Sequence, residues 1–167
     1  MTAKRAPILN LDAVPLDDWC HGDRFAARLG QIGPKIGARK LGCRLIVLPP
    51  GKAVWPLHAH YVNEEMFIVL DGTGCLRLGD DRHPIRAGDV IAMPPEPEMP
   101  HQIVNDGNSD LRYLAISTME EPDIVACPDS GKIGIMAGSP PGGNKEDRTL
   151  TLYVRRDSAV DYWDGED

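Results

Sequence analysis

Apolar residues occur in short runs along the chain, and turns rich in glycine and proline separate these runs. Each run has the length and the aliphatic content of a strand. The predicted strands cover Leu41 to Leu48, Val54 to His60, Glu65 to Leu70, Thr73 to Leu78, Val90 to Met93, Leu111 to Thr118, Asp123 to Cys127, Ile133 to Met136 and Leu150 to Val154. Turn sequences such as Asp71-Gly72 join one strand to the next, so hairpin follows hairpin. This order predicts an all-β protein built as an antiparallel barrel.

The strand Glu65 to Leu70 is apolar on both faces. Residues two apart in a strand point the same way, so Phe67 and Val69 share one face with Glu65, and the alternate positions, also apolar, occupy the other. A strand with one solvated face alternates polar and apolar residues instead. We therefore expect the N-terminal segment or a second subunit to cover the outer face, and on this basis we predict a homodimer.

Residues 1–40 show no sustained period of 2 or 3.6 residues and contain several glycines and prolines. We expect an irregular N-terminal arm with one helical turn near Leu16 to Trp19. The arm still carries apolar side chains that need cover, namely Ile8, Leu9, Leu11, Trp19, Phe25 and Leu29. It should therefore pack on the barrel or on a partner. The predicted organisation is this arm (1–40), one barrel (41–156) and an acidic C-terminal tail (157–167).

The composition is typical of one folded domain of 167 residues, with 42% apolar and 26% charged residues. A net charge of −7 and the lack of a basic cluster argue against nucleic acid as a partner. The N-terminus lacks the apolar region of a secretory signal, and no stretch approaches the roughly 20 apolar residues of a membrane span. The four cysteines are widely spaced and form no Cys-x-x-Cys pair. We therefore expect a cytoplasmic protein without membrane contacts or disulfides.

Histidines and a glutamate supply the candidate chemistry. His58 and His60 lie two apart in a predicted strand, so both imidazoles can reach one point. Glu65 begins the next strand and His101 opens a further apolar stretch. Strand parity turns Glu65 inward and its neighbour Glu64 outward. Three imidazoles and one carboxylate suit one divalent transition metal ion, and iron, manganese, nickel and zinc are all candidates.

The same residues form part of two spaced motifs. The first is Gly51-x6-His58-x-His60-x4-Glu65-x6-Gly72, and the second is Gly88-x5-Pro94 followed by His101-x3-Asn105. Together they resemble the two motifs of the cupin superfamily over residues 41–118. The chain departs from the usual cupin pattern in two places. The spacer after Gly51 is one residue longer, and Pro-Glu-Pro-Glu-Met-Pro stands before His101 in place of a shorter loop with glycine.

The resemblance implies a jelly-roll β-barrel with a metal ion inside, ligated at the matching positions His58, His60, Glu65 and His101. It also implies a range of activities, namely isomerase, dioxygenase, decarboxylase or lyase. We expect a metal-dependent enzyme that acts on a small oxygenated molecule such as a sugar phosphate or an organic acid. No residue stands out as a general base apart from the metal ligands. The alternative is therefore a noncatalytic cupin that binds or senses a small ligand.

Three arginines lie within otherwise apolar strand segments, where an unpaired guanidinium is costly. They are Arg44, Arg77 and Arg112. One or more of them is a candidate for holding a carboxylate or phosphate of the ligand at the mouth of the barrel. For each arginine, the alternative is an outward position on a solvated face or a pair with a neighbouring acid.

Overall fold

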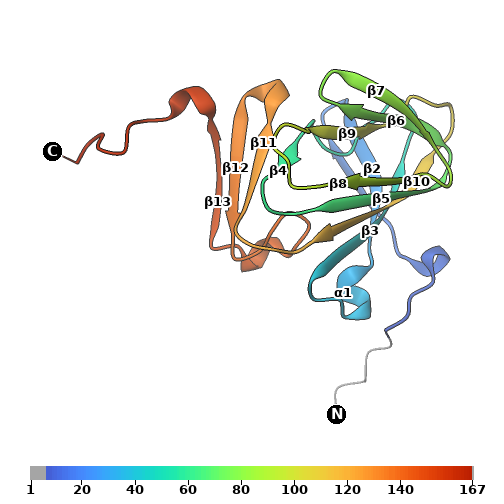
Figure 1. Cartoon of the computed structure of the whole chain (residues 1–167). Coiled ribbons are helices and arrows are strands. Elements are labelled where there is room, and N and C mark those ends of the chain that lie inside the picture. The colour runs from blue at the N-terminus through green and yellow to red at the C-terminus, as the bar shows by residue number, and fades with distance from the viewer. Residues whose placement is uncertain (1–6, 167) are drawn as a thin grey trace, which may run out of the picture.

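The computed structural model describes residues 7–166, which form mainly antiparallel strands (Figure 1). The strands are β1 (Asp17–His21), β2 (Phe25–Gln31), β3 (Leu41–Leu48), β4 (Ala59–His60), β5 (Glu65–Asp71), β6 (Thr73–Leu78), β7 (Asp81–Arg86), β8 (Val90–Met93), β9 (His101–Val104), β10 (Leu111–Thr118), β11 (Asp123–Cys127), β12 (Lys132–Ala137) and β13 (Leu150–Arg155). The helical elements are short: α1 (Gly33–Ile36), η1 (Leu11–Ala13), η2 (Pro128–Ser130), η3 (Lys145–Asp147) and η4 (Arg156–Ser158). No helix in the described range is long and apolar enough to cross a membrane.

Three sheets build the molecule. The largest has the order β1-β2-β3-β10-β5-β8, the second β7-β6-β9 and the third β13-β12-β11-β4. The first two enclose the barrel, and the third lies at one end of it (Figure 1). Strands far apart in sequence are neighbours, as β3 and β10 show by pairing along their full lengths. The predicted all-β jelly-roll barrel is confirmed.

The hydrophobic core lies between the two barrel sheets. Its buried side chains come from alternate strand positions and include Ile46, Leu48, Phe67, Val69, Leu76, Ile85, Ile103, Leu111 and Tyr113. Each such aliphatic or aromatic side chain contributes about 1.5–3 kcal/mol on burial. A shift of one residue in any strand would turn its core residues outward, so this burial fixes the register. The same register determines which polar side chains point into the barrel.

The segment before residue 41 is more regular than the sequence indicated. Residues 17–31 form the hairpin β1–β2, and β2 pairs with β3, so the hairpin extends the largest sheet. The helical turn expected near Leu16 to Trp19 is wrong, because β1 begins there. Gly22, at the hairpin turn, has a φ of 56°, which glycine adopts at little cost. Pairing with a distant strand stabilises this hairpin, and the local sequence pattern does not reveal such pairing.

Apolar residues from the first described part of the chain cover some of the outer face of the largest sheet. They form a cluster in which Leu9, Leu11, Val14 and Leu16 pack with Leu45, Leu70 and Leu114. The outer face of β5 is therefore covered at Leu70, whereas Met66 near its other end remains 39% exposed. We still predict that a second subunit covers the exposed part of this face of β5.

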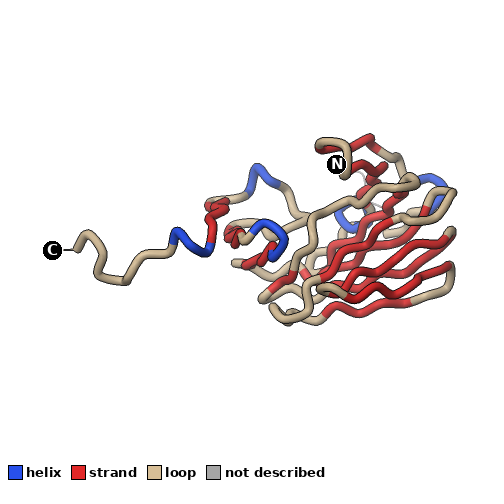
Figure 2. The backbone as a smooth tube through the Cα atoms, turned by 90° about the horizontal axis from the view of Figure 1, so that it is seen from above, coloured by secondary structure: helices blue, strands red, loops and turns tan. Residues whose placement is uncertain are grey.

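The third sheet leaves one face partly open to solvent. On one side, Val125 and Met136 are buried, whereas the alternate positions of the same strands are at least partly exposed. The alternate positions of β11 and β12, together with the residues of β13 that pair beside them, form an outer aliphatic face. It consists of Ile124, Ala126, Ile133, Ile135, Ala137, Leu150, Leu152 and Val154. Beyond β13 the chain extends away from the barrel (Figure 2), and Tyr162 and Trp163 there are 83% and 69% exposed.

Candidate metal centre

Strands of all three sheets bring four polar side chains to one point inside the barrel. His60 ends β4, Glu65 begins β5 and His101 begins β9. His58 precedes β4 and is joined to His101 by two backbone hydrogen bonds, from His58 N to His101 O at 3.1 Å and from His101 N to His58 O at 2.7 Å. This bridge places the two imidazoles side by side, with ring centroids 4.7 Å apart.

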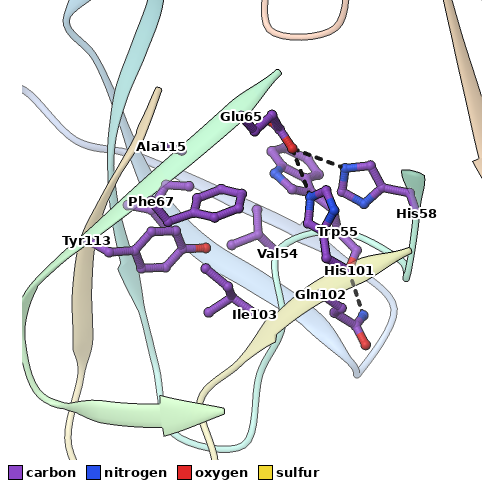
Figure 3. A pocket seen from close by; sticks show the side chains of 11 residues that line it. Val54, Trp55, His58, Glu65, Phe67, His101, Gln102, Ile103, Tyr113 and Ala115 are labelled. Carbon is purple, nitrogen blue, oxygen red and sulfur yellow. Dashed lines mark hydrogen bonds and ion pairs between the residues drawn. The ribbon is translucent and has the colours of Figure 1, made fainter. Parts of the chain in front are cut away.

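The carboxylate of Glu65 lies at the centre of the three imidazoles. Its Oε2 atom is 2.9 Å from Nε2 of His101, 3.5 Å from Nε2 of His60 and 3.8 Å from Nε2 of His58. Figure 3 shows Glu65 facing His58 and His101 across the top of the pocket. The alternative carboxylate, Glu64, is exposed. The structure thus brings together the four side chains that the two motifs single out.

Hydrogen bonds at the far side of two rings fix how the imidazoles point. Nδ1 of His60 lies 2.7 Å from Oδ2 of the fully buried Asp123, and Nδ1 of His58 lies 2.9 Å from the carbonyl oxygen of Pro56. Both partners are acceptors, so each Nδ1 carries the proton. Nε2 of each ring is left facing Glu65, which is the orientation that a metal ligand requires.

Burial and close neighbours control the charges in this cluster. Burial, together with the neighbouring His101, lowers the pKa of His58 to about 4, so its imidazole is neutral at pH 7. Burial also opposes charge on His60, but its hydrogen bonds to Asp123 and Glu65 outweigh that effect and raise the pKa of His60. Burial alone would raise the pKa of Glu65, yet hydrogen bonds from His101 and His60 hold it well below its usual range. Glu65 is therefore an ionised carboxylate among nitrogen donors.

The residues fit a divalent transition metal ion. Bonds of about 2.0–2.2 Å from one ion to nitrogen and oxygen place neighbouring ligand atoms roughly 3–3.5 Å apart. Ligand atoms of His58, His60 and Glu65 lie within 4.8 Å of one another. His101 lies outside this group of three, although its Nε2 is 2.9 Å from Oε2 of Glu65, so it becomes a fourth ligand if its ring turns toward His60. Three imidazoles and one carboxylate also leave a coordination position for water or substrate.

A small cavity of about 30 Å³ adjoins the four side chains. Its wall is mostly apolar and includes Val54, Phe67 and Ile103, and the hydroxyl of Tyr113 points toward its interior (Figure 3). A volume of this size holds one or two water molecules. The cavity therefore has room for one or two donor atoms of a ligand.

The three candidate arginines have different positions. Arg77 faces away from the core and forms a bidentate pair with Asp129, at 2.7 and 3.0 Å. Arg112 lies on the outer face of the largest sheet, where it contacts Asp12 at 3.2 Å. Arg44 alone shares the inner face of its strand with core residues, and its guanidinium carbon lies 5.9 Å from the centre of the Trp55 ring, which lines the cavity. The structure therefore brings Arg44 to the site and leaves Arg77 and Arg112 outside it.

Sequence reasoning missed three residues that shape the site, namely Asp123, Trp55 and Tyr113. Asp123 carried a usable signal, because an acid at the head of the apolar run Asp123 to Cys127 needs a buried partner. Its partner, His60, is 63 positions away, and the pairing of β4 with β11 brings the two together. Trp55 and Tyr113 carried no comparable signal, since aromatic residues in strands are most often core residues.

Comparison with known proteins agrees with the fold and the motifs. Residues 44–117 match the family model described as a cupin domain. The chain therefore carries a cupin domain over residues 44–117. A solved structure similar to the chain over almost its whole length is that of a proposed sugar phosphate isomerase from Acidithiobacillus ferrooxidans, with a TM-score of 0.78, 25% identity, and coverage of 93% of this chain and 96% of that chain.

Two curated relatives match this chain over shorter segments. An uncharacterized protein of Methanocaldococcus jannaschii is 39% identical over 61 residues, which is 36% of this chain and 47% of that protein. The oxalate-binding protein of Thermotoga maritima is 39% identical over 69 residues, which is 41% of this chain and 54% of that protein. The matched segments thus span about half the length of these two relatives.

Proposed function

We propose that this cupin is a metal-dependent enzyme that acts on a small oxygenated molecule, and that isomerisation of a sugar phosphate is its reaction. One observation carries the proposal. The Nε2 atoms of three histidines surround the ionised carboxylate of Glu65, and Asp123 and Pro56 fix the orientation of two of the rings. Such an arrangement of ligand atoms, prepared before the ion binds, is what a catalytic metal site needs.

The ion would be held by His58, His60, Glu65 and His101. When bound, it supplies a Lewis acid that polarises a carbonyl or hydroxyl oxygen of the substrate. The protein itself supplies the setting, since Val54, Phe67 and Ile103 exclude bulk water from the cavity. Low local polarity strengthens every charge interaction at the reacting atoms. Aldose and ketose phosphates offer adjacent oxygens of the kind that such a site binds.

A sugar phosphate is the favoured substrate because one similar structure matches almost the whole chain. The Acidithiobacillus protein, described as a proposed sugar phosphate isomerase, matches this chain along 93% of its length. The match therefore includes the N-terminal hairpin and the third sheet as well as the cupin domain. An organic acid is the next candidate substrate, for which the same site would support decarboxylase, dioxygenase or lyase chemistry.

The test is a turnover assay on protein loaded with Mn²⁺, Fe²⁺, Ni²⁺ or Zn²⁺. Proton NMR in D₂O follows a panel of aldose and ketose phosphates, and isomerisation appears as a new sugar signal together with exchange at the carbon next to the carbonyl. An oxygen electrode measures oxygen consumption with organic acids, which tests the alternative dioxygenase activity. We expect isomerisation in the loaded protein and none in His60→Ala. Conversion at equal rates in both proteins contradicts the proposal.

A noncatalytic binding protein is the second candidate. The small cavity and the similarity to the oxalate-binding protein of Thermotoga maritima favour it. Calorimetry separates the two functions, because a binding protein shows saturable heat with oxalate or a related acid and no product after prolonged incubation. Product formation with any member of the panel excludes this candidate.

A further inference from the structure

Arg44 lies on the inner face of β3, beside the metal centre. Its strand neighbours on that face, Ile46 and Leu48, are core residues, and its partner across the sheet is Ala115, which lines the cavity. A guanidinium among such neighbours is displaced from water. Burial accordingly lowers the pKa of Arg44, an effect that the negative charge of Glu65 partly offsets. Arginine remains protonated in such surroundings, so a full positive charge stands here.

An aromatic stack holds this cation in place. The guanidinium carbon of Arg44 lies 5.9 Å from the centre of the Trp55 ring, within the range of a cation–π contact. Trp55 in turn packs on Trp19 of the N-terminal hairpin, with ring centroids 4.8 Å apart and planes inclined by 58°. The hairpin therefore supports the wall on which Arg44 lies. A supported arginine loses less conformational freedom when it binds a ligand.

The side chain of Arg44 donates no hydrogen bond to any of residues 7–166. The arginine ion pairs of the described residues use Arg28, Arg77, Arg82 and Arg112. The five N–H groups of Arg44 are therefore left without a carboxylate or carbonyl partner. These N–H groups are open to water or to an oxyanion of a ligand, because Oδ1 of Asp123 is the one buried side-chain polar atom without a partner in the described range.

A second polar group is left unpaired at the same cavity. Tyr113 is 2% exposed, its hydroxyl points into the cavity (Figure 3), and none of the described residues forms a hydrogen bond with it. The hydroxyl is reached through the cavity, since Oδ1 of Asp123 is the one buried side-chain polar atom without a partner among the described residues. Tyr113 thus offers a donor inside the cavity, and Arg44 offers donors beside Trp55, which lines it.

The charges near the cavity favour a negative ligand. A divalent ion and Arg44 together bring three positive charges, against one negative charge each from Glu65 and Asp123. With an ion bound, the centre would therefore be positive within a chain whose net charge is −7. The cavity admits only one or two donor atoms, so the rest of a ligand would lie outside it.

We propose that Arg44 binds an oxyanion of the ligand, a carboxylate or a phosphate, while another oxygen of the same molecule reaches the metal ion and Tyr113. The planar guanidinium accepts either group as a bidentate partner. The inference rests on the proposed function, since it assigns the part of the substrate that does not react. It also predicts that neutral sugars and alcohols bind poorly.

Calorimetric titration of the full chain with three related probes tests the role of Arg44. D-glycerate carries a carboxylate, glycerol 3-phosphate carries a phosphate, and glycerol carries neither. We expect one or both anions to bind better than glycerol, and Arg44→Gln to weaken that binding roughly ten- to a hundredfold. Arg44→Lys, which keeps the charge and loses the bidentate geometry, should give an intermediate affinity. The anion whose affinity falls in Arg44→Gln identifies the oxyanion class that Arg44 binds.

Arg77→Gln is the matched control, because it removes the same charge from a site outside the pocket. It should bind both anions like the wild type, and all variants should keep the wild-type metal content and circular dichroism spectrum. The titrations are run on metal-loaded and on EDTA-treated protein. Failure to hold any metal rejects the proposed function, while the comparison of wild type with Arg44→Gln still decides the role of Arg44. Equal anion affinities in these two proteins, or no anion binding to the wild type, overturn the inference.

Discussion

Nδ1 of His60 lies 2.7 Å from Oδ2 of Asp123, and the two side chains are 5% and 0% exposed. Asp123 is on β11 of the third sheet, outside the two barrel sheets. Its carboxylate fixes the protonated nitrogen of the imidazole and the rotation of the ring, so that Nε2 faces Glu65. The third sheet thus contributes to the metal centre by orienting a ligand.

Removal of this carboxylate should weaken metal binding. Asp123→Asn keeps the size of the side chain but takes away the charge that stabilises the His60 orientation. We expect the affinity for Zn²⁺ or Mn²⁺ to fall roughly 10- to 100-fold, as measured by titration of metal-free protein. Asp129→Asn, at an exposed carboxylate, serves as the control and should bind like the wild type. Wild-type affinity in Asp123→Asn would show that Asp123 does not orient a ligand.

Removal of the metal ion should lower thermal stability. An ion that binds only the folded state stabilises it by about 2.7 kcal/mol at a free concentration 100 times Kd. For a domain of this size, that free energy corresponds to a Tm shift of roughly 5–10 °C. Differential scanning calorimetry before and after dialysis against EDTA measures the shift, and readdition of the ion should restore the original Tm. An unchanged Tm in a protein shown to lose its ion contradicts the prediction.

The outer aliphatic face of the third sheet should be covered by a second copy of the chain. Leu150 and Leu152 are 46% and 42% exposed there, and open apolar patches of this kind mark protein interfaces. Sedimentation analysis should give about twice the chain mass of 18.3 kDa. Leu152→Asp should yield monomers, whereas Thr151→Asp, on the opposite face of the strand, should not. A monomeric wild type at micromolar concentration rejects the homodimer.

The Arg77–Asp129 pair should contribute modestly to stability and only above acidic pH. Hydrogen bonds from Arg77 lower the pKa of Asp129, so the contribution is present above the unfolded pKa and is lost as pH falls through the folded pKa. Because both side chains are partly exposed, we expect Arg77→Ala to lower the free energy of unfolding by about 0.5–1 kcal/mol at pH 7. Urea unfolding at pH 7 and near pH 3 measures the difference, which should shrink at the lower pH. A constant difference would exclude a charge effect.

The succession of strands and turns predicted the barrel, and local spacing predicted that three of the side chains cluster, whereas His101 was assigned through the resemblance to the second cupin motif. His58, His60 and Glu65 lie within eight positions of one another, and strand parity decides which way each points. The N-terminal hairpin was not predictable in the same way. Its strand β2 is stabilised by pairing with β3, and its apolar positions do not alternate clearly.

The local sequence pattern was not sufficient to predict which arginine lies at the site. In β3 both Leu45 and Ile46 are buried, because the N-terminal segment covers the outer face while the core covers the inner one. Parity therefore could not tell whether Arg44 pointed inward or outward. Only long-range packing, on Trp55 for Arg44 and against Asp129 for Arg77, separates the two arginines.

The metal content of the purified, untagged protein shows whether the three histidines and Glu65 hold an ion. Elemental analysis of the wild type, His58→Ala, His101→Ala and the exposed-histidine control His83→Ala gives the number of ions per chain. We predict about one divalent transition metal ion per chain in the wild type and in His83→Ala, and a large loss in the other two variants. Equal metal content in all four proteins would mean that His58 and His101 bind no metal ion.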